Sequence, residues 1–137
     1  MPLAYIVIDT NILVSAHLNP NGLENRVNML ANEGVLWRFV TREILAEYES
    51  VLRRPKFPFQ PSRLDESLSQ IRQTSTLVVP SRTLRVSPDE SDNRFLECAE
   101  TAQADFLVKG NQRHYPEQWG KIRIVSARPL LDLLFAS

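Results

Sequence analysis

Short apolar runs alternate along this chain with stretches in which apolar residues recur every three or four positions. The first run, Ala4 to Ile8, contains five apolar residues without interruption and stops at Asp9. Such a run, bounded by polar residues, is typical of a strand buried on both faces of a parallel sheet. We therefore expect Asp9 at the carboxyl end of the first strand, the edge at which open α/β sheets bind ligands. The alternative is that Asp9 only caps the following helix, a common role for aspartate.

Further runs and spacings predict the rest of the fold. Four more apolar runs predict strands at residues 35–40, 76–79, 106–108 and 122–125. Apolar residues spaced three or four apart predict helices that begin near residues 12, 23, 42, 62, 88 and 129. Because strands alternate with helices almost throughout, we expect an α/β fold in three layers, with a parallel sheet of about five strands flanked by helices.

Length and composition narrow the class of protein. A chain of 137 residues is typical of one domain, so we expect residues 1–137 to form a single unit. No apolar run approaches the roughly 20 residues of a membrane span, and the start of the chain has no signal-like pattern. We therefore expect a cytoplasmic protein with no membrane partner. The single cysteine, Cys98, excludes an internal disulfide and a cysteine zinc cluster.

Charge and motif content exclude several functions. Sixteen basic and sixteen acidic residues give a formal net charge of zero, which argues against a protein that coats nucleic acids non-specifically. A local basic rim around an acidic pocket is compatible with that balance. His17 and His114 are far apart and lie in no zinc motif, and the four glycines form no phosphate-binding loop.

The helix predicted from Pro88 to about Ala102 carries a carboxylate on its apolar side. Ser87 suits the N-cap of this helix and Pro88 its first position. With 100° per residue, Asp92 falls within the apolar stripe and Asp89 beside it, whereas the polar side holds Glu90, Arg94 and Glu97. A buried carboxylate is costly unless it is paired or binds a metal. Complementing the helix dipole accounts for Asp89 but poorly for Asp92, which we interpret as a site residue.

The helix after Thr41 offers three glutamates. Its apolar stripe is centred near Ile44, Tyr48 and Val51. Two of the glutamates, Glu47 and Glu49, border the stripe on opposite sides, and Glu43 points further outward. Periodicity narrows the choice to Glu47 or Glu49 without deciding between them, and either also suits an ordinary surface helix.

Carboxylates gathered at the carboxyl edge of a sheet would support one main kind of chemistry. Clustered oxygen ligands suit Mg²⁺ or Mn²⁺, and such ions promote phosphodiester cleavage. Asn111 follows the predicted strand 106–108 and places an amide where another carboxylate would complete the acidic ring. Asp105 lies at the other end of that strand, so we interpret it as structural.

Four stretches, read in order, resemble PIN-domain ribonucleases. They are Ile8–Ala16, Ile44–Phe57, Asp89–Ala99 and Ala104–Asn111, and together they span nearly the whole chain. The resemblance is in particular to PIN proteins described as toxin components of toxin–antitoxin systems, related to VapC-type toxins. It implies a five-stranded parallel sheet between helices, which agrees with the strands predicted above.

The resemblance also implies roles for individual residues. Asp9, Glu47 and Asp92 match the family's acidic positions, with Asp89 as a further metal-binding neighbour of Asp92. The family's fourth acidic position, in a Thr-Gly-Asp sequence, aligns with Asn111, which is a weaker ligand because an amide is neutral. In the mechanism that follows, Thr10 and Asn11 support the pocket through hydrogen bonds. Lys109 and Arg113 are the candidates for phosphate binding.

The implied function is Mg²⁺- or Mn²⁺-dependent hydrolysis of RNA phosphodiesters by a toxin, with a cognate antitoxin and a homodimer as further expectations. Two other interpretations stay open. The substitution at Asn111 favours an inactive PIN scaffold that binds RNA or a protein partner. A phosphoaspartate domain of the receiver or haloacid-dehalogenase type also places an Asp at a strand end, but the second type expects Asp-x-Asp where this chain has Asp9-Thr10-Asn11.

Overall fold

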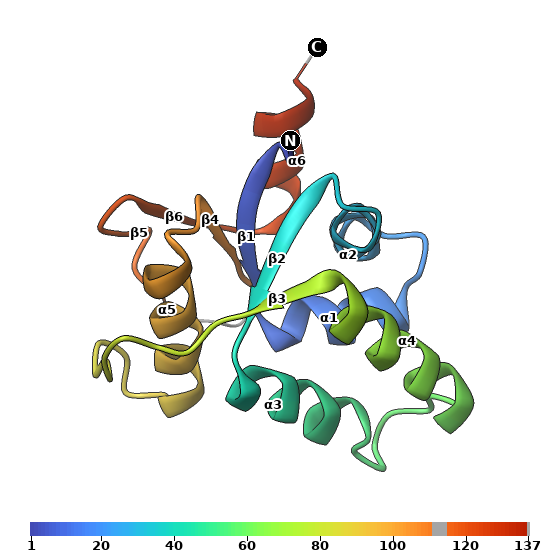
Figure 1. Ribbon diagram of the computed structural model, residues 1–137. Coiled ribbons are helices and arrows are strands. Elements are labelled where there is room, and N and C mark those ends of the chain that lie inside the picture. Colours follow the sequence, from blue (N-terminus) through green and yellow to red (C-terminus); the bar gives the residue numbers. More distant parts are fainter. Residues whose placement is uncertain (111–114, 137) are drawn as a thin grey trace.

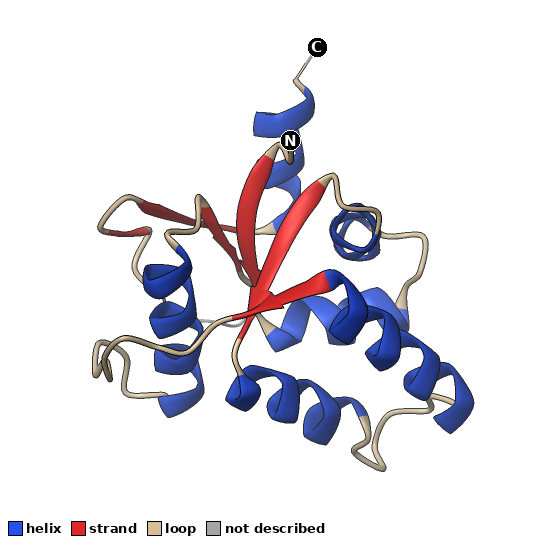
Figure 2. Ribbon diagram, viewed as in Figure 1, coloured by secondary structure: helices blue, strands red, loops and turns tan. Residues whose placement is uncertain are grey.

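The computed structural model describes residues 1–110 and 115–136 and shows a central, mostly parallel sheet covered by helices (Figure 1). The strands are β1 (Ala4–Ile8), β2 (Leu36–Val40), β3 (Ser75–Leu77), β4 (Phe106–Val108), β5 (Gln118–Trp119) and β6 (Ile122–Val125). The helices are α1 (Thr10–Leu18), α2 (Leu23–Asn32), α3 (Arg42–Leu52), α4 (Pro61–Thr74), α5 (Glu90–Ala102) and α6 (Ala127–Phe135). Figure 2 shows the strands together in the sheet and the helices around them.

The order of the strands places β1 at the centre of the sheet. Within the described residues the sheet has six strands in the order β3-β2-β1-β4-β6-β5. From β1 the chain builds outward to β2 and β3, and then crosses to the other side of β1 to form β4 and β6. The crevice outside the carboxyl ends of β1 and β4 is therefore the switch point at which α/β sheets bind ligands.

The predicted α/β class with a parallel sheet and flanking helices is confirmed. The strands predicted at 106–108 and 122–125 match β4 and β6, and β1 occupies the predicted run. The sheet has six strands where about five were predicted. The additional strand is β5, which pairs antiparallel with β6 across a turn in which Gly120 has a φ of 59°. Two residues are too few to produce a periodic pattern, and so the sequence did not predict β5.

The observed start of α3 agrees with the prediction, whereas those of α5 and α6 differ from it by a few residues. Thr41 caps α3 as expected, and its hydroxyl accepts a hydrogen bond from the backbone N–H of Ile44 at 3.1 Å. The predicted N-cap of α5 is wrong: Asp89, not Ser87, caps this helix, which begins at Glu90. The Ser87 hydroxyl is used instead by Asp92, which is described below. Helix α6 begins at Ala127, two residues earlier than predicted.

Helices cover the two faces of the sheet. α5 packs against β1, β2 and β4, whereas α2 packs against β2 and α6. In Figure 1, α5 and α2 lie on opposite sides of β1 and β2. None of the described helices combines the length and apolar character that a bilayer-spanning segment requires.

The interface between β2, α2 and α4 contains a buried arginine, Arg38, with no exposed surface. Its guanidinium donates to Asn28 Oδ1 at 2.5 Å, and to Asn32 Oδ1 and Thr74 Oγ1 at 3.1 Å each. No ion pair to Arg38 is found among the described residues. Asn32 and Thr74 are the last residues of α2 and α4, so the negative ends of two helix dipoles stabilise this charge. Burial lowers the pKa of Arg38 to about 10, which leaves the side chain charged at neutral pH.

The carboxyl end of β1 is tied to α3 by Tyr48, which is fully buried. Its hydroxyl donates a hydrogen bond to the backbone carbonyl of Ile8, the last residue of β1. Burial raises the pKa of this hydroxyl well above its usual value, so that it remains a protonated donor. The contact fixes the position of α3 relative to the strand end.

Replacing Arg38 tests its role at the helix ends. Arg38→Met keeps much of the volume but leaves the oxygens of buried Asn28 and of half-buried Asn32 and Thr74 without this donor. We expect the free energy of unfolding to fall by about 2–3 kcal/mol, as measured by urea denaturation. Arg26→Met, an exposed arginine on α2, is the matched control and should change it by less than about 0.5 kcal/mol. Equal effects of both variants would contradict a specific role for Arg38.

Removing one oxygen tests the contact between α3 and β1. Tyr48→Phe should lower the free energy of unfolding by about 1–2 kcal/mol, because the Ile8 carbonyl loses its buried donor. Thermal or urea unfolding measures the change. The control is Tyr5→Phe, which removes the hydroxyl of a half-buried tyrosine on β1. A Tyr48→Phe protein as stable as the control would show that the contact contributes nothing.

Candidate functional site

The site is built around Asp9, which is fully buried where β1 turns into α1. Its backbone N–H donates to the Val108 carbonyl at 2.9 Å, which joins the ends of β1 and β4. Its carboxylate caps α1 by accepting the N–H of Asn11 at 3.2 Å. Asp9 therefore has the capping role considered for it and also lies at the expected edge of the sheet.

Glu47 is brought to this strand end by Thr10. The Thr10 hydroxyl, one residue after Asp9, donates a hydrogen bond to Glu47 Oε2. Glu49 instead pairs with Arg53 at 3.1 Å and with Arg72 at 2.7 Å. The structure thus directs Glu47 toward Asp9, and Glu49 toward a surface ion-pair network. Tyr48, between them, holds the same strand end through Ile8.

Asp92 and Asp89 have different environments in the first turn of α5. Asp92 is 2% exposed, and its Oδ2 accepts a hydrogen bond from the Ser87 hydroxyl at 3.1 Å. Asp89 is exposed and caps the helix by accepting from the N–H of Ser91 at 3.0 Å. In Figure 1, the amino end of α5 and the carboxyl end of β1 lie toward the same edge of the sheet.

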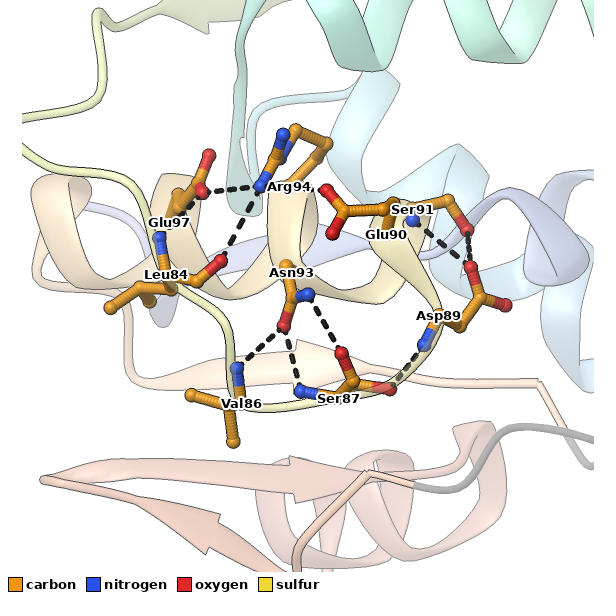
Figure 3. Close-up of polar contacts among 9 residues, drawn as sticks. All are labelled: Leu84, Val86, Ser87, Asp89, Glu90, Ser91, Asn93, Arg94 and Glu97. Carbon is orange, nitrogen blue, oxygen red and sulfur yellow. Dashed lines mark hydrogen bonds and ion pairs between the residues drawn. The ribbon is translucent and has the colours of Figure 1, made fainter.

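Asn93 holds the segment of residues 84–88 that carries Ser87 (Figure 3). Its side-chain oxygen accepts from the N–H groups of Val86 at 3.0 Å and Ser87 at 2.8 Å. Its amide nitrogen donates to the Ser87 carbonyl at 2.9 Å. These three hydrogen bonds position the Ser87 hydroxyl beside Asp92. The sequence pattern does not reveal this role, because an asparagine in the first turns of a helix is ordinarily interpreted as a surface residue.

The same segment covers what was predicted to be the polar side of α5. Glu97 is 4% exposed and accepts from the Leu84 N–H at 2.8 Å. Arg94 pairs with Glu97 at 2.8 Å and donates to the Leu84 carbonyl at 3.4 Å, as Figure 3 shows. Glu97 lies on the predicted polar side of the helix and is nevertheless buried, because Leu84 and Arg94 contact its carboxylate there.

Of the remaining predicted residues, the structure describes Lys109, which follows β4. Lys109 is half-buried, and its backbone N–H donates to the Val125 carbonyl at 2.8 Å. Gly110 packs directly on Asn11: a Cβ at position 110 would lie 2.5 Å from the Asn11 Cβ. Asn111 and Arg113 lie outside the described residues.

The predicted carboxylates have the donor chemistry of a hard divalent cation. Asp9, Glu47 and Asp92 offer only oxygen atoms, which Mg²⁺ and Mn²⁺ prefer. Each carboxylate has about four lone-pair positions, so Glu47 and Asp92 can accept from Thr10 and Ser87 and still bind an ion. Within residues 1–110 and 115–136, however, no group of three or more Asp, Glu, His or Cys side chains is already arranged as a ligand set.

Comparison with known proteins agrees with this architecture. A family model described as PIN domain matches residues 5–113. The chain is also 29% identical over 110 residues to an uncharacterized protein of Methanocaldococcus jannaschii, a match that covers 78% of this chain and 70% of that protein. The chain therefore belongs to the PIN-domain family, whose members are generally nucleases that use divalent metal ions.

Proposed function

We propose that this protein is a Mg²⁺- or Mn²⁺-dependent endoribonuclease whose catalytic residues are Asp9, Glu47 and Asp92. The observation that carries the proposal is the hydrogen bond from Thr10 to Glu47, because it brings a second carboxylate to the strand end that carries Asp9. The PIN family supplies the reaction class, which is hydrolysis of nucleic-acid phosphodiesters.

The residues have distinct roles in this proposal. A bound divalent ion supplies Lewis-acid stabilisation of the charge that develops on the phosphodiester during hydrolysis. Asp9, Glu47 and Asp92 hold the ion, and each is oriented by a neighbouring donor. The proposed secondary roles are a further metal contact for Asp89, a weak ligand or water-orienting group for Asn111, and phosphate contacts for Lys109 and Arg113.

We further propose that the protein acts in the cytoplasm as the toxin of a toxin–antitoxin pair, with residues 1–137 as one PIN-like unit. A small cognate antitoxin and a homodimer belong to this proposal, and both rest on the family resemblance. An adjacent reading frame that encodes a small DNA-binding protein, and rescue of growth when it is co-expressed, would support the toxin role. Unimpaired growth on induction of this chain alone would contradict it.

A second candidate is a PIN scaffold that binds RNA or a protein without cleaving it. Two observations favour it. Asn111 stands where the resemblance expects an acidic residue, and the described carboxylates form no complete ligand set. Titration calorimetry with Mn²⁺ separates the candidates: the scaffold predicts no binding at millimolar metal and no cleavage, whereas the nuclease predicts both.

Removing one carboxylate charge tests the proposed metal ligands. Asp9→Asn and Asp92→Asn should each reduce Mn²⁺-dependent cleavage of single-stranded RNA at least about 100-fold, or about 2.7 kcal/mol in the barrier. The substitutions remove charge without volume, so circular dichroism should show an intact fold. Cleavage that either variant retains in full, insensitive to EDTA, would refute the metal assignment.

Glu47 and Glu49 form a matched pair for a second test. Glu47→Gln should reduce cleavage at least about 100-fold and weaken Mn²⁺ binding, because the carboxylate beside Asp9 is lost. Glu49→Gln should leave cleavage unchanged and lower the free energy of unfolding by at most about 1 kcal/mol, because its partners are surface arginines. The reverse pattern would assign the role to Glu49.

A further inference from the structure

A cavity of about 470 Å³ opens at the carboxyl edge of the sheet beside the candidate site. Its walls include Lys109, which follows β4, and Ser126, which follows β6. Asn11, two residues after Asp9, forms another wall. Since β1, β4 and β6 are adjacent and parallel, the cavity lies at the same edge of the sheet as Asp9.

The charges that line this cavity favour an anion. Lys109 and Arg128 both contribute to its walls, against a single acidic residue, Glu24. Across residues 1–110 and 115–136, no ion pair involves either cation. Two basic residues that line one cavity and make no ion pair within the described residues are a favourable arrangement for phosphate, which Lys and Arg bind through charge-assisted hydrogen bonds.

The polar groups around the two cations add to the positive potential. Ser126 is the N-cap residue of α6, and its side chain makes no capping hydrogen bond. The first turn of α6 contains no acidic residue, and its first residues line the cavity, so the positive end of the helix dipole adds to the potential there. Ser15 and Ser126 also place hydroxyl groups in its walls. These features supplement the two cations and are not sufficient for a site without them.

Asn11 connects this cavity to the candidate catalytic residues. Its side chain belongs to the cavity wall, while its backbone N–H donates to the Asp9 carboxylate at 3.2 Å. Gly110 packs on the same asparagine, so the end of β4 approaches closely. A phosphate bound in the cavity would therefore lie beside the residue whose backbone N–H holds the Asp9 carboxylate.

We propose that this cavity binds a phosphate group through Lys109, Arg128 and Ser126, and that this phosphate belongs to the nucleotide next to the scissile bond of the RNA. The assignment to RNA rests on the proposed function. The cavity itself is an anion site that holds the substrate backbone in register with Asp9. Such contacts position a nucleic acid without reading its sequence.

Inorganic phosphate tests the cavity without any cleavage. We expect phosphate, added at constant ionic strength against chloride, to shift the amide resonances of Ala127 and Arg128 saturably in ¹⁵N–¹H spectra. Arg128→Gln and Lys109→Gln should each raise the Kd for phosphate about tenfold, because each removes one charge-assisted hydrogen bond. Lys121→Gln, a cation at the opposite end of β6, is the matched control. No saturable shift, or an equal effect of the control, would overturn the proposal.

Single-stranded RNA tests the occupant. The binding constant for RNA is measured in an Asp9→Asn background, which removes cleavage. A plot of its logarithm against the logarithm of the salt concentration should become shallower by about 0.7 for each RNA phosphate that the variant no longer neutralises. We expect this change for Lys109→Gln and Arg128→Gln and none for Lys121→Gln. Unchanged slopes in all variants would overturn the assignment to RNA. If the wild-type protein binds phosphate but does not cleave RNA, the proposed nuclease function is refuted and the anion site in the cavity is supported.

Discussion

The end of β1 and the middle of α3 are joined by two hydrogen bonds on which the candidate site depends. Tyr48 donates to the Ile8 carbonyl before Asp9, and Glu47 accepts from Thr10 after it. Neighbouring residues of one helix thus contact the residues on both sides of a buried aspartate, one at a backbone carbonyl and the other at a side-chain hydroxyl. Because each contact fixes the helix against the strand, the carboxylate of Glu47 is positioned by the fold and not by a flexible side chain alone.

Two buried charged side chains, Arg38 and Asp92, make hydrogen bonds to neutral partners. Arg38 is surrounded by amide, hydroxyl and carbonyl oxygens at two helix ends, and Asp92 accepts from the Ser87 hydroxyl. The two cases differ in what they allow. The guanidinium of Arg38 is enclosed, which suits a structural role, whereas a carboxylate that accepts from a hydroxyl retains lone pairs for a cation.

The pattern of apolar residues predicted features that depend on one strand or one helix alone. Apolar runs located β1, β4 and β6, and the stripe on α5 identified Asp92 as a carboxylate on the buried side. They did not separate Glu47 from Glu49, because both flank the same stripe and the distinguishing partner, Thr10, is 37 residues away. They also gave no sign that Glu97, on the polar side of its helix, is buried, because the segment that contacts it has no periodic structure from which its path can be predicted.

A nuclease must hold a cation and attract a polyanion at neighbouring positions, and this chain separates the two requirements in space. Carboxylates lie at the end of β1 and on the helices beside it, while Lys109 and Arg128 line a cavity beyond Asn11. A chain with zero formal net charge has no long-range attraction for RNA, so binding must come from such local groups. Asn11 links the two regions, because it lines the cavity and its backbone N–H donates to the Asp9 carboxylate.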